Sequence, residues 1–326
     1  MKEKTIYKTA YRLFNSLAIR YSISLMAALL LLAGCEDFFI SEATNVDIPG
    51  SEPQLVVYSF ISPRDTMIRV KVYRSLPNTM DPRNVPPVNG EAHVHMAKKG
   101  EAFTQLSYDE NLMAFVINAN DFAVEAGNEY TLRVESFMGE SVEAECFVPG
   151  FEIDTVILAD PVQTTYQYEE IKTSFVWEVQ PAPSSQVRYF RSGAYISTWG
   201  NYENQQQLIL MSVMPLSIDT GQEYFTHTDE SARVFKGSTW GYLNLGGGSI
   251  DYGNFNRIDS VFAYVMQTDY HYYQFHKSVE NYYNSDDGFI FSEAVYIYSN
   301  IKGGLGVFGG YNQKNYFWTA TPEEDK

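Results

Sequence analysis

The residue in this chain with the clearest chemistry is Cys35, which closes the tetrad Leu32-Ala33-Gly34-Cys35. An apolar run over residues 23–33 precedes it, and five basic side chains lie within the first twenty residues. A basic segment, an apolar segment and small residues before a cleavage point form a secretory signal. Cysteine directly after Ala-Gly is typical of bacterial lipoproteins, in which the thiol takes a diacylglyceryl group and becomes the mature N-terminus. We therefore predict a signal peptide over residues 1–34 and lipidation at Cys35.

A membrane-spanning helix is the alternative interpretation of residues 23–33. Crossing a bilayer takes roughly 20 apolar residues, and this run is far shorter. The sequence thus favours an acylated chain held at a bacterial membrane. Two or more acyl chains suffice for stable anchoring, because each buried methylene contributes about 0.8 kcal/mol.

The charge of the chain argues against nucleic acid as a partner. The whole chain has a net charge of −17, and residues 1–34 contain five basic residues and one acid, a net of +4. Removing that segment leaves −21 on the mature chain. Phosphate backbones and anionic lipid headgroups repel such a body, and the charge also keeps an exposed protein soluble.

Cys146 is the one other cysteine in the sequence. Once Cys35 is lipidated, no intramolecular disulfide can form. Around Cys146, apolar residues alternate with Glu143 and Glu145, and this period of two places the thiol on the buried side of a strand. We expect a small core residue there and no nucleophile.

Two other segments could hold a metal ion. His93 and His95 point to one face of a predicted strand, but no further Cys or His cluster completes a four-ligand set. Residues 284–288, with Glu293 following, are rich in oxygen ligands but miss the spacing of a calcium-binding EF-hand loop. We interpret the histidines as solvated strand residues and residues 284–288 as a helix cap and turn, and we predict no metal.

The remaining motifs do not complete an active site. Residues 303–310 are glycine-rich but lack the Lys-Ser/Thr pair of a phosphate-binding loop. Ser299 and Lys302 have the Ser-x-x-Lys spacing without the partner motifs of serine acyltransferases. Because no constellation of nucleophile, base and orienting group is complete, the sequence predicts neither an enzyme nor a cofactor.

The pattern after Gln54 is that of a mainly β protein. Residues 36–53 show no periodicity and carry turn formers, which indicates a tether over residues 35–52. About seven short alternating strands then follow up to residue 148, which favours an immunoglobulin- or fibronectin-like β-sandwich over residues 53–149. Tyr130 takes the place of the tyrosine that bonds back to the preceding corner in such domains.

The alternation stops at Pro149-Gly150, where we place a domain boundary. Residues 150–326 are predicted to form a second β-rich domain, including a strand over residues 295–298 and a final strand near residues 316–318. One helix is expected over residues 269–284, with aromatic residues at helical spacing and Asp269 as its N-cap. Aromatic residues make up 15% of the chain, which suits both β-strands and binding interfaces.

Two blocks of the sequence resemble a known family. They are residues 291–311 and the pairing of Cys35-Glu36-Asp37 with residues 55–57 and 61–66. Together they are similar to an uncharacterised lipoprotein family of the Bacteroidota, a domain of unknown function. Members are often encoded beside TonB-dependent receptors, which implies an accessory role at the outer membrane. The acids Glu36 and Asp37 are similar to cell-surface export signals, and the family implies no catalytic residues.

Starch-utilisation glycan-binding lipoproteins share the Cys-Glu-Asp-Phe opening and the receptor partnership. They are built largely of helical repeats, which this sequence does not show, so they offer an analogy of role alone.

From these features we predict a non-catalytic lipoprotein, anchored on the surface or periplasmic face of the outer membrane, that assists a TonB-dependent receptor by presenting a ligand or stabilising the complex. The alternative is a surface-anchored hydrolase acting on glycan or peptide. For partner contact the sequence indicates residues 299–311, in particular Leu305, Phe308 and Tyr311. The glycines there either expose backbone to a partner or permit a tight internal bend.

Overall fold

The computed structural model describes residues 53–75, 88, 90–167, 170–202, 205–219, 223–242, 257–285 and 296–319. The predicted signal peptide and tether lie outside these residues. So do most of the proline-rich loop over residues 77–89, the oxygen-rich segment beyond residue 285, and Val295.

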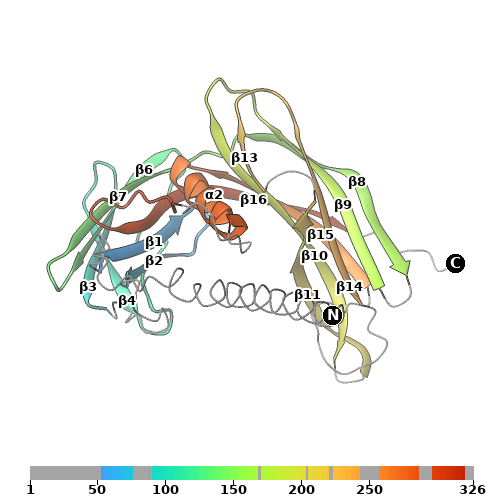
Figure 1. Ribbon diagram of the computed structural model, residues 1–326, viewed down its shortest axis with the longest axis horizontal. Coiled ribbons are helices and arrows are strands. Elements are labelled where there is room, and N and C mark those ends of the chain that lie inside the picture. Colours follow the sequence, from blue (N-terminus) through green and yellow to red (C-terminus); the bar gives the residue numbers. More distant parts are fainter. Residues whose placement is uncertain are drawn as a thin grey trace, which may run out of the picture. The chain divides into compact units, whose positions relative to one another are not determined.

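The structure is mainly β, as the alternating sequence predicts (Figure 1). Its first seven strands are β1 (Leu55–Ile61), β2 (Met67–Arg74), β3 (Ala92–Lys98), β4 (Thr104–Asp109), β5 (Ala114–Asn118), β6 (Asn128–Ser136) and β7 (Ser141–Val148). The later strands are β8 (Ile153–Gln167), β9 (Glu170–Pro181), β10 (Arg188–Tyr202), β11 (Gln205–Pro215), β12 (Ser217–Ile218), β13 (Tyr224–His227), β14 (Arg233–Tyr242), β15 (Arg257–Thr268) and β16 (Leu305–Thr319). In the described part of the chain a single helix, α2 (Tyr270–Ser285), follows β15.

The strands form two sheets. The larger has the order β11-β10-β15-β16-β1-β2-β5-β4-β3-β6-β7, with β13 paired to β10. The smaller has the order β12-β14-β9-β8. Neighbours within both sheets are antiparallel except β1 and β16, which run parallel. The larger sheet therefore joins the first seven strands to the last part of the chain through β16.

The first hydrophobic cluster is enclosed by β1 to β7. In β2, for example, Ile68, Val70 and Val72 are buried while Arg69 and Lys71 face solvent, which is the alternation read from the sequence. On β6 the hydroxyl of Tyr130 accepts a hydrogen bond from the backbone N–H of Glu125 at 2.6 Å. The predicted tyrosine corner is confirmed, and so is the burial of Cys146 in this cluster.

The second hydrophobic cluster lies between the smaller sheet and strands β10, β13 and β15. Trp177 on β9 is fully buried and stacks on Phe235 of β14 with a ring separation of 5.4 Å. Its indole N–H donates to the Ser192 hydroxyl at 3.0 Å, and that hydroxyl donates to the carbonyl of Tyr264. A polar chain thus ties β9, β10 and β15 together inside an aromatic core.

Strand β16 contributes to both clusters. Phe308, near its start, is buried in the first cluster, whereas Tyr316 and Trp318, near its end, pack against the second. The division of the chain at residue 150 stays a prediction.

The sequence placed the final strand too late. We predicted a strand near residues 316–318 after a glycine-rich segment, but β16 already begins at Leu305. The glycines permit this early start because the backbone packs very closely here. A Cβ on Gly306 would lie 2.0 Å from the carbonyl oxygen of Val57 on β1, and a Cβ on Gly310 would lie 2.3 Å from that of Phe147 on β7.

The predicted strand over residues 295–298 is wrong for the residues that the structure describes. Residues 296–300 form no ladder. Instead the side chain of Asn300 accepts a hydrogen bond from the N–H of Phe308 and donates to the carbonyls of Phe308 and Glu145. An amide side chain therefore supplies the bonds that a neighbouring strand would have made.

Candidate functional site

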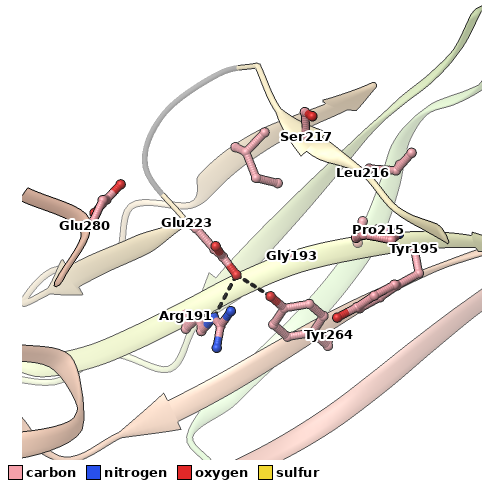
Figure 2. A pocket seen from close by; sticks show the side chains of 11 residues that line it. Arg191, Gly193, Tyr195, Pro215, Leu216, Ser217, Glu223, Tyr264 and Glu280 are labelled. Carbon is pink, nitrogen blue, oxygen red and sulfur yellow. Dashed lines mark hydrogen bonds and ion pairs between the residues drawn. The ribbon is translucent and has the colours of Figure 1, made fainter. Parts of the chain in front are cut away.

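A polar pocket of about 390 Å³ lies over β10, β15 and the loop that precedes β13. Figure 2 shows its lining. Its polar floor consists of Arg191, Glu223 and Tyr264, and Tyr195 lies beside Tyr264 with ring centres 5.6 Å apart. Leu216 and Ile218 also line the pocket. Glu280 of α2 completes one side. This pocket is the candidate site because it gathers charged and aromatic side chains from distant parts of the chain.

The Glu223 carboxylate is held from two directions. Arg191 Nε donates to Glu223 Oε1 at 2.7 Å, and the Tyr264 hydroxyl donates to the same oxygen. The three groups are brought together because β10 and β15 pair side by side, with Arg191 opposite Met266 and Ser192 opposite Val265. The carbonyl of Glu223 accepts a bond from the Ser192 N–H at 2.9 Å, which fixes the loop on β10.

The helix α2 closes the site from the other side. The Tyr272 hydroxyl accepts a hydrogen bond from Arg191 Nη1 at 3.0 Å. His276, one turn later, lies 4.4 Å from the Tyr272 ring and stacks on Tyr224 of β13 at 5.6 Å between ring centres. Arg191 also lies 5.1 Å from the Tyr224 ring centre, in the geometry of a cation–π contact.

A missing side chain makes room for this arrangement. Gly193 lies two residues after Arg191 on β10, beneath the Tyr264 ring. A Cβ at Gly193 would lie 2.4 Å from the Tyr264 hydroxyl oxygen and 2.5 Å from Cζ. Glycine is therefore required for Tyr264 to lie flat across β10 and reach Glu223.

Burial sets the protonation states around the pocket. It raises the pKa of the Tyr224 and Tyr264 hydroxyls above their ordinary value, so both stay neutral at physiological pH. Burial and the nearby Arg191 lower the pKa of His276 to about 4, so the imidazole is neutral too. The charged groups of the floor are then the paired Arg191 and Glu223. Such a site can bind a ligand through fixed hydroxyls and aromatic faces.

A larger groove of about 630 Å³ lies between β7 and the start of α2, and Asp269 lines it. The Asp269 side chain accepts bonds from the N–H of Tyr272 at 2.7 Å and from that of Phe147 at 3.2 Å. The predicted N-cap is thus confirmed, and the same carboxyl also holds the edge of β7. Burial raises its pKa to about 7 despite these donors.

The predicted partner-contact residues all lie on β16 but differ in their exposure to solvent. Phe308 is fully buried, Leu305 is 39% exposed, and the half-buried Tyr311 donates a hydrogen bond to Asp65 at 3.2 Å. None of the three lines the polar pocket. Their role in partner contact stays a prediction, and Cys35 lies outside the described residues.

The two histidines considered as metal ligands lie on one strand face, with ring centres 6.4 Å apart. His93 packs against Phe137 at 4.9 Å and is within 3.4 Å of the Gln105 side-chain amide. Over the described ranges, no three His, Cys, Asp or Glu side chains gather closely enough to hold a metal ion. Nor does any helix there have the length and apolarity to span a membrane.

Sequence reasoning missed the polar pocket. Arg191, Glu223 and Tyr264 are 32 and 41 residues apart along the chain, and no local motif connects them. The available local signal is an arginine and a glycine two residues apart, Arg191 and Gly193, in a strand that also buries Phe190, Ala194 and Ile196. Such a pair indicates a buried ion pair with a bulky neighbour, but it does not identify the partners.

The fold and pocket define a β-rich protein whose described residues form two hydrophobic cores and an open polar pocket. By its sequence the chain belongs to the family described as domain of unknown function (DUF4249), whose profile matches residues 42–316. A comparison with curated proteins gives no match. Among solved structures, the native conformation of E. coli alpha-2-macroglobulin, determined by cryo-EM, matches at 9% identity and a TM-score of 0.20. The match covers 80% of this chain and 20% of that one, and at this TM-score it carries no argument.

Proposed function

We propose that this chain is a non-catalytic lipoprotein, anchored to the bacterial outer membrane through Cys35, that assists a TonB-dependent receptor. It would present a ligand to the receptor or stabilise the complex. The anchor rests on the signal-like segment before Cys35, and the partnership rests on the family resemblance of the sequence.

One observation carries the non-catalytic part of the proposal. The ionic groups in the floor of the pocket bond to one another: Glu223 is engaged by Arg191 and Tyr264, and Arg191 is also engaged by Tyr272. A catalytic base or nucleophile must be available to substrate, whereas these groups already satisfy their partners. A rigid, internally bonded cluster suits shape recognition or the positioning of α2.

A hydrolase acting on glycan would need two carboxylates in this pocket. Glu223 and Glu280 both line it, but Figure 2 shows Glu280 apart from the Arg191–Glu223–Tyr264 group. Glu280 forms an ion pair with Lys277 on its own helix. Neither carboxylate is therefore set up as a member of an acid/base pair acting across one bond.

Affinity purification from detergent-solubilised outer membranes tests the proposal. The full chain, tagged at its C-terminus, should co-purify with a receptor barrel in stoichiometric amount. A Cys35→Ser chain is the matched control, because it leaves every described residue unchanged. Recovery of the protein alone, together with hydrolysis of a glycan or peptide substrate that the Glu223→Gln variant abolishes, would contradict the proposal.

A further inference from the structure

The sandwich-like unit that β1 to β7 form around the first hydrophobic cluster is called the first sandwich, and one of its ends can be traced through its strand register. Leu55, where β1 begins, pairs with Arg74, where β2 ends. The Arg74 guanidinium forms an ion pair with Glu140 in the turn between β6 and β7. Val70 pairs with Phe115, so the start of β5 also points toward the end of β2. This end, which we call the tether end, therefore includes the start of β1, the β4–β5 turn (residues 110–113) and the β6–β7 turn (residues 137–140).

Both turns at the tether end present large apolar side chains to solvent. Met138 is 74% exposed, Phe137 61% and Met113 60%, and Leu112 is exposed as well. Single exposed apolar residues are common on soluble proteins. Here two adjacent pairs, on two turns at the same end, expose apolar area of the kind that marks an interaction site.

Hydrogen bonds order the backbone of both turns. Asp109 accepts bonds from the N–H groups of Asn111 and Leu112, and the Ser136 hydroxyl accepts bonds from those of Met138 and Glu140. Met113 has a φ of +46°, a conformation that glycine or asparagine adopts more readily. A methionine thus occupies a position at which glycine or asparagine would strain the backbone less.

The opposite end of the sandwich differs in chemistry. The β1–β2 turn there reads Ser62-Pro63-Arg64-Asp65-Thr66, and the carbonyl of Thr66 accepts a bond from Ala119 in the next turn. Phe103, a partly exposed apolar residue at that end, lies 4.6 Å beneath the Arg133 guanidinium. Among the described turns between β1 and β7, the largest apolar exposures, those of Met113, Phe137 and Met138, are therefore at the end where the chain enters the sandwich. Elsewhere, Val187 in the turn between β9 and β10 is also 53% exposed.

We propose that Leu112, Met113, Phe137 and Met138, which we call the apolar tips, insert into the lipid surface to which Cys35 is anchored. This inference rests on the proposed lipid anchor. The chain before Gln54 leads to the tether end, since Gln54 bonds to Ser75 just after β2. Residues 35–52 could extend about 60 Å, so the anchor alone does not fix the orientation of the sandwich. The four apolar side chains would supply that orientation.

Charge indicates which lipids suit this surface. Cleavage before Cys35 leaves the mature chain with a net charge of −21. Glu110 adjoins the apolar side chains of the β4–β5 turn, whereas Glu140 in the β6–β7 turn is paired with Arg74. Insertion should therefore depend on apolar contact with zwitterionic lipid and should weaken on anionic lipid. A polybasic surface would show the opposite preference.

An environment-sensitive probe at position 138 tests the proposal. The lipidated full chain carrying Met138→Cys is labelled with the NBD fluorophore and reconstituted into phosphatidylcholine vesicles. Cys146 is buried and does not compete for the label, and Cys35 has no free thiol once lipidated. The matched control is Asn120→Cys, an exposed polar turn position at the opposite end.

We expect the emission of the probe at 138 to shift to the blue and gain several-fold in intensity on vesicles, while the probe at 120 stays aqueous. Replacing part of the phosphatidylcholine by phosphatidylglycerol should reduce the shift. Phe137→Ser, read with the probe at 138, should reduce it as well, and circular dichroism should show the fold unchanged. An aqueous signal at 138 on vesicle-bound protein overturns the proposal and leaves the anchor standing.

The experiment can contradict lipidation at Cys35 and insertion of the apolar tips independently of each other. If Cys35 takes the NBD label, the thiol is free and the proposed lipidation is wrong. Insertion of the apolar tips is then measured with the probe at position 138 on a Cys35→Ser chain. An N-terminal polyhistidine tag binds this chain to vesicles that contain nickel-chelating lipid. A probe at 138 that is aqueous on every vesicle, but buried when a solubilised receptor is added, would assign the patch to a protein partner and contradict insertion into lipid.

Discussion

At the scale of single residues, Gly306 shows how tightly β16 is built onto β1. It has a φ of +108°, and a Cβ there would lie 2.0 Å from the Val57 carbonyl oxygen. Gly100 has a φ of +85° but nothing within 4 Å of its would-be Cβ. Both glycines have a positive φ, but only at Gly306 does the backbone of a neighbouring strand occupy the space that a Cβ would need.

We predict that Gly306→Ala destabilises the protein by more than about 3 kcal/mol, because backbone must move to admit the methyl group. Gly100→Ala should cost only about 1 kcal/mol, the strain of the left-handed conformation alone. Urea unfolding followed by tryptophan fluorescence measures both variants. Equal losses would show that the approach of β16 to β1 does not decide the requirement for glycine.

Asp269 joins three elements through one side chain and its backbone. The carboxyl caps α2 and accepts from β7, and the Asp269 N–H donates to the Gly310 carbonyl of β16. Burial raises the pKa of this carboxyl from 3.8 to about 7. The folded state therefore holds a proton between about pH 4 and pH 7 that the unfolded state releases.

The sign of the pH dependence follows from that difference. Stability associated with the neutral carboxyl is fully present below about pH 4 and is lost as the pH rises to about 7, by an amount on the order of 4 kcal/mol. Asp269→Asn should flatten this part of the profile while keeping a capping oxygen for α2. Denaturant midpoints between pH 4 and 8 measure the effect, and an identical slope in the variant would contradict it.

At the scale of elements, the attachment of α2 to β10 depends on Arg191 and Tyr272. The hydroxyl of Tyr272 is also 3.5 Å from the Met266 sulfur, so the phenol lies between β10 and β15. The helix presents aromatic rather than aliphatic residues to the sheet, and Phe60 packs edge-on against the Tyr272 ring at 4.9 Å. The Tyr272 hydroxyl therefore contributes a directional hydrogen bond to an interface that otherwise consists of contacts between aromatic rings.

A double-mutant cycle on Arg191→Leu and Tyr272→Phe isolates that hydroxyl. We expect a coupling free energy of about 1 to 2 kcal/mol, because a hydrogen bond from a charged donor in a partly buried site exceeds a neutral one. Chemical denaturation of the four proteins gives the value. A second cycle that combines Arg191→Leu with Tyr273→Phe, on the same helix, is the control and should show no coupling free energy. A coupling of equal size in that cycle would contradict a specific hydrogen bond between Arg191 and Tyr272.

Elements could be predicted from the sequence wherever buried residues recur with the period of the strand or helix that contains them. The alternation in β2 and β7, the tyrosine corner at Tyr130 and the Asp269 cap all depend on residues close in the chain, and the structure confirms each. The start of β16 was misjudged because glycines resemble a loop locally. They become a strand only through the backbone of β1 and β7, which the sequence brings together over more than 150 residues.

The polar pocket was beyond sequence reasoning for the same reason. Its ion pair depends on Glu223, just before β13, being held against β10, and no spacing within the chain encodes that contact. By contrast, the burial of Cys146 needs only the alternation of its own strand. Long-range pairing, and not residue chemistry, limits what could be predicted.

At the scale of the whole molecule, the two cysteines should differ completely in reactivity. Burial raises the pKa of the Cys146 thiol well above its ordinary value, so it stays protonated inside the first cluster. Cys35 directly follows the signal-like segment and lies before the sandwich. Any acyl group on the chain should therefore be carried by Cys35.

Labelling of cells with an alkyne fatty acid tests this assignment. The unaltered chain and a Cys146→Ala variant should both take up label and fractionate with membranes. Cys35→Ser should lose the label and leave the membrane fraction, because the apolar tips alone hold the protein far more weakly than two or more acyl chains. The change lies outside all described strands, so the soluble variant should keep the β-rich circular dichroism of the unaltered protein. Label that persists in Cys35→Ser would show that the anchor lies elsewhere in the chain.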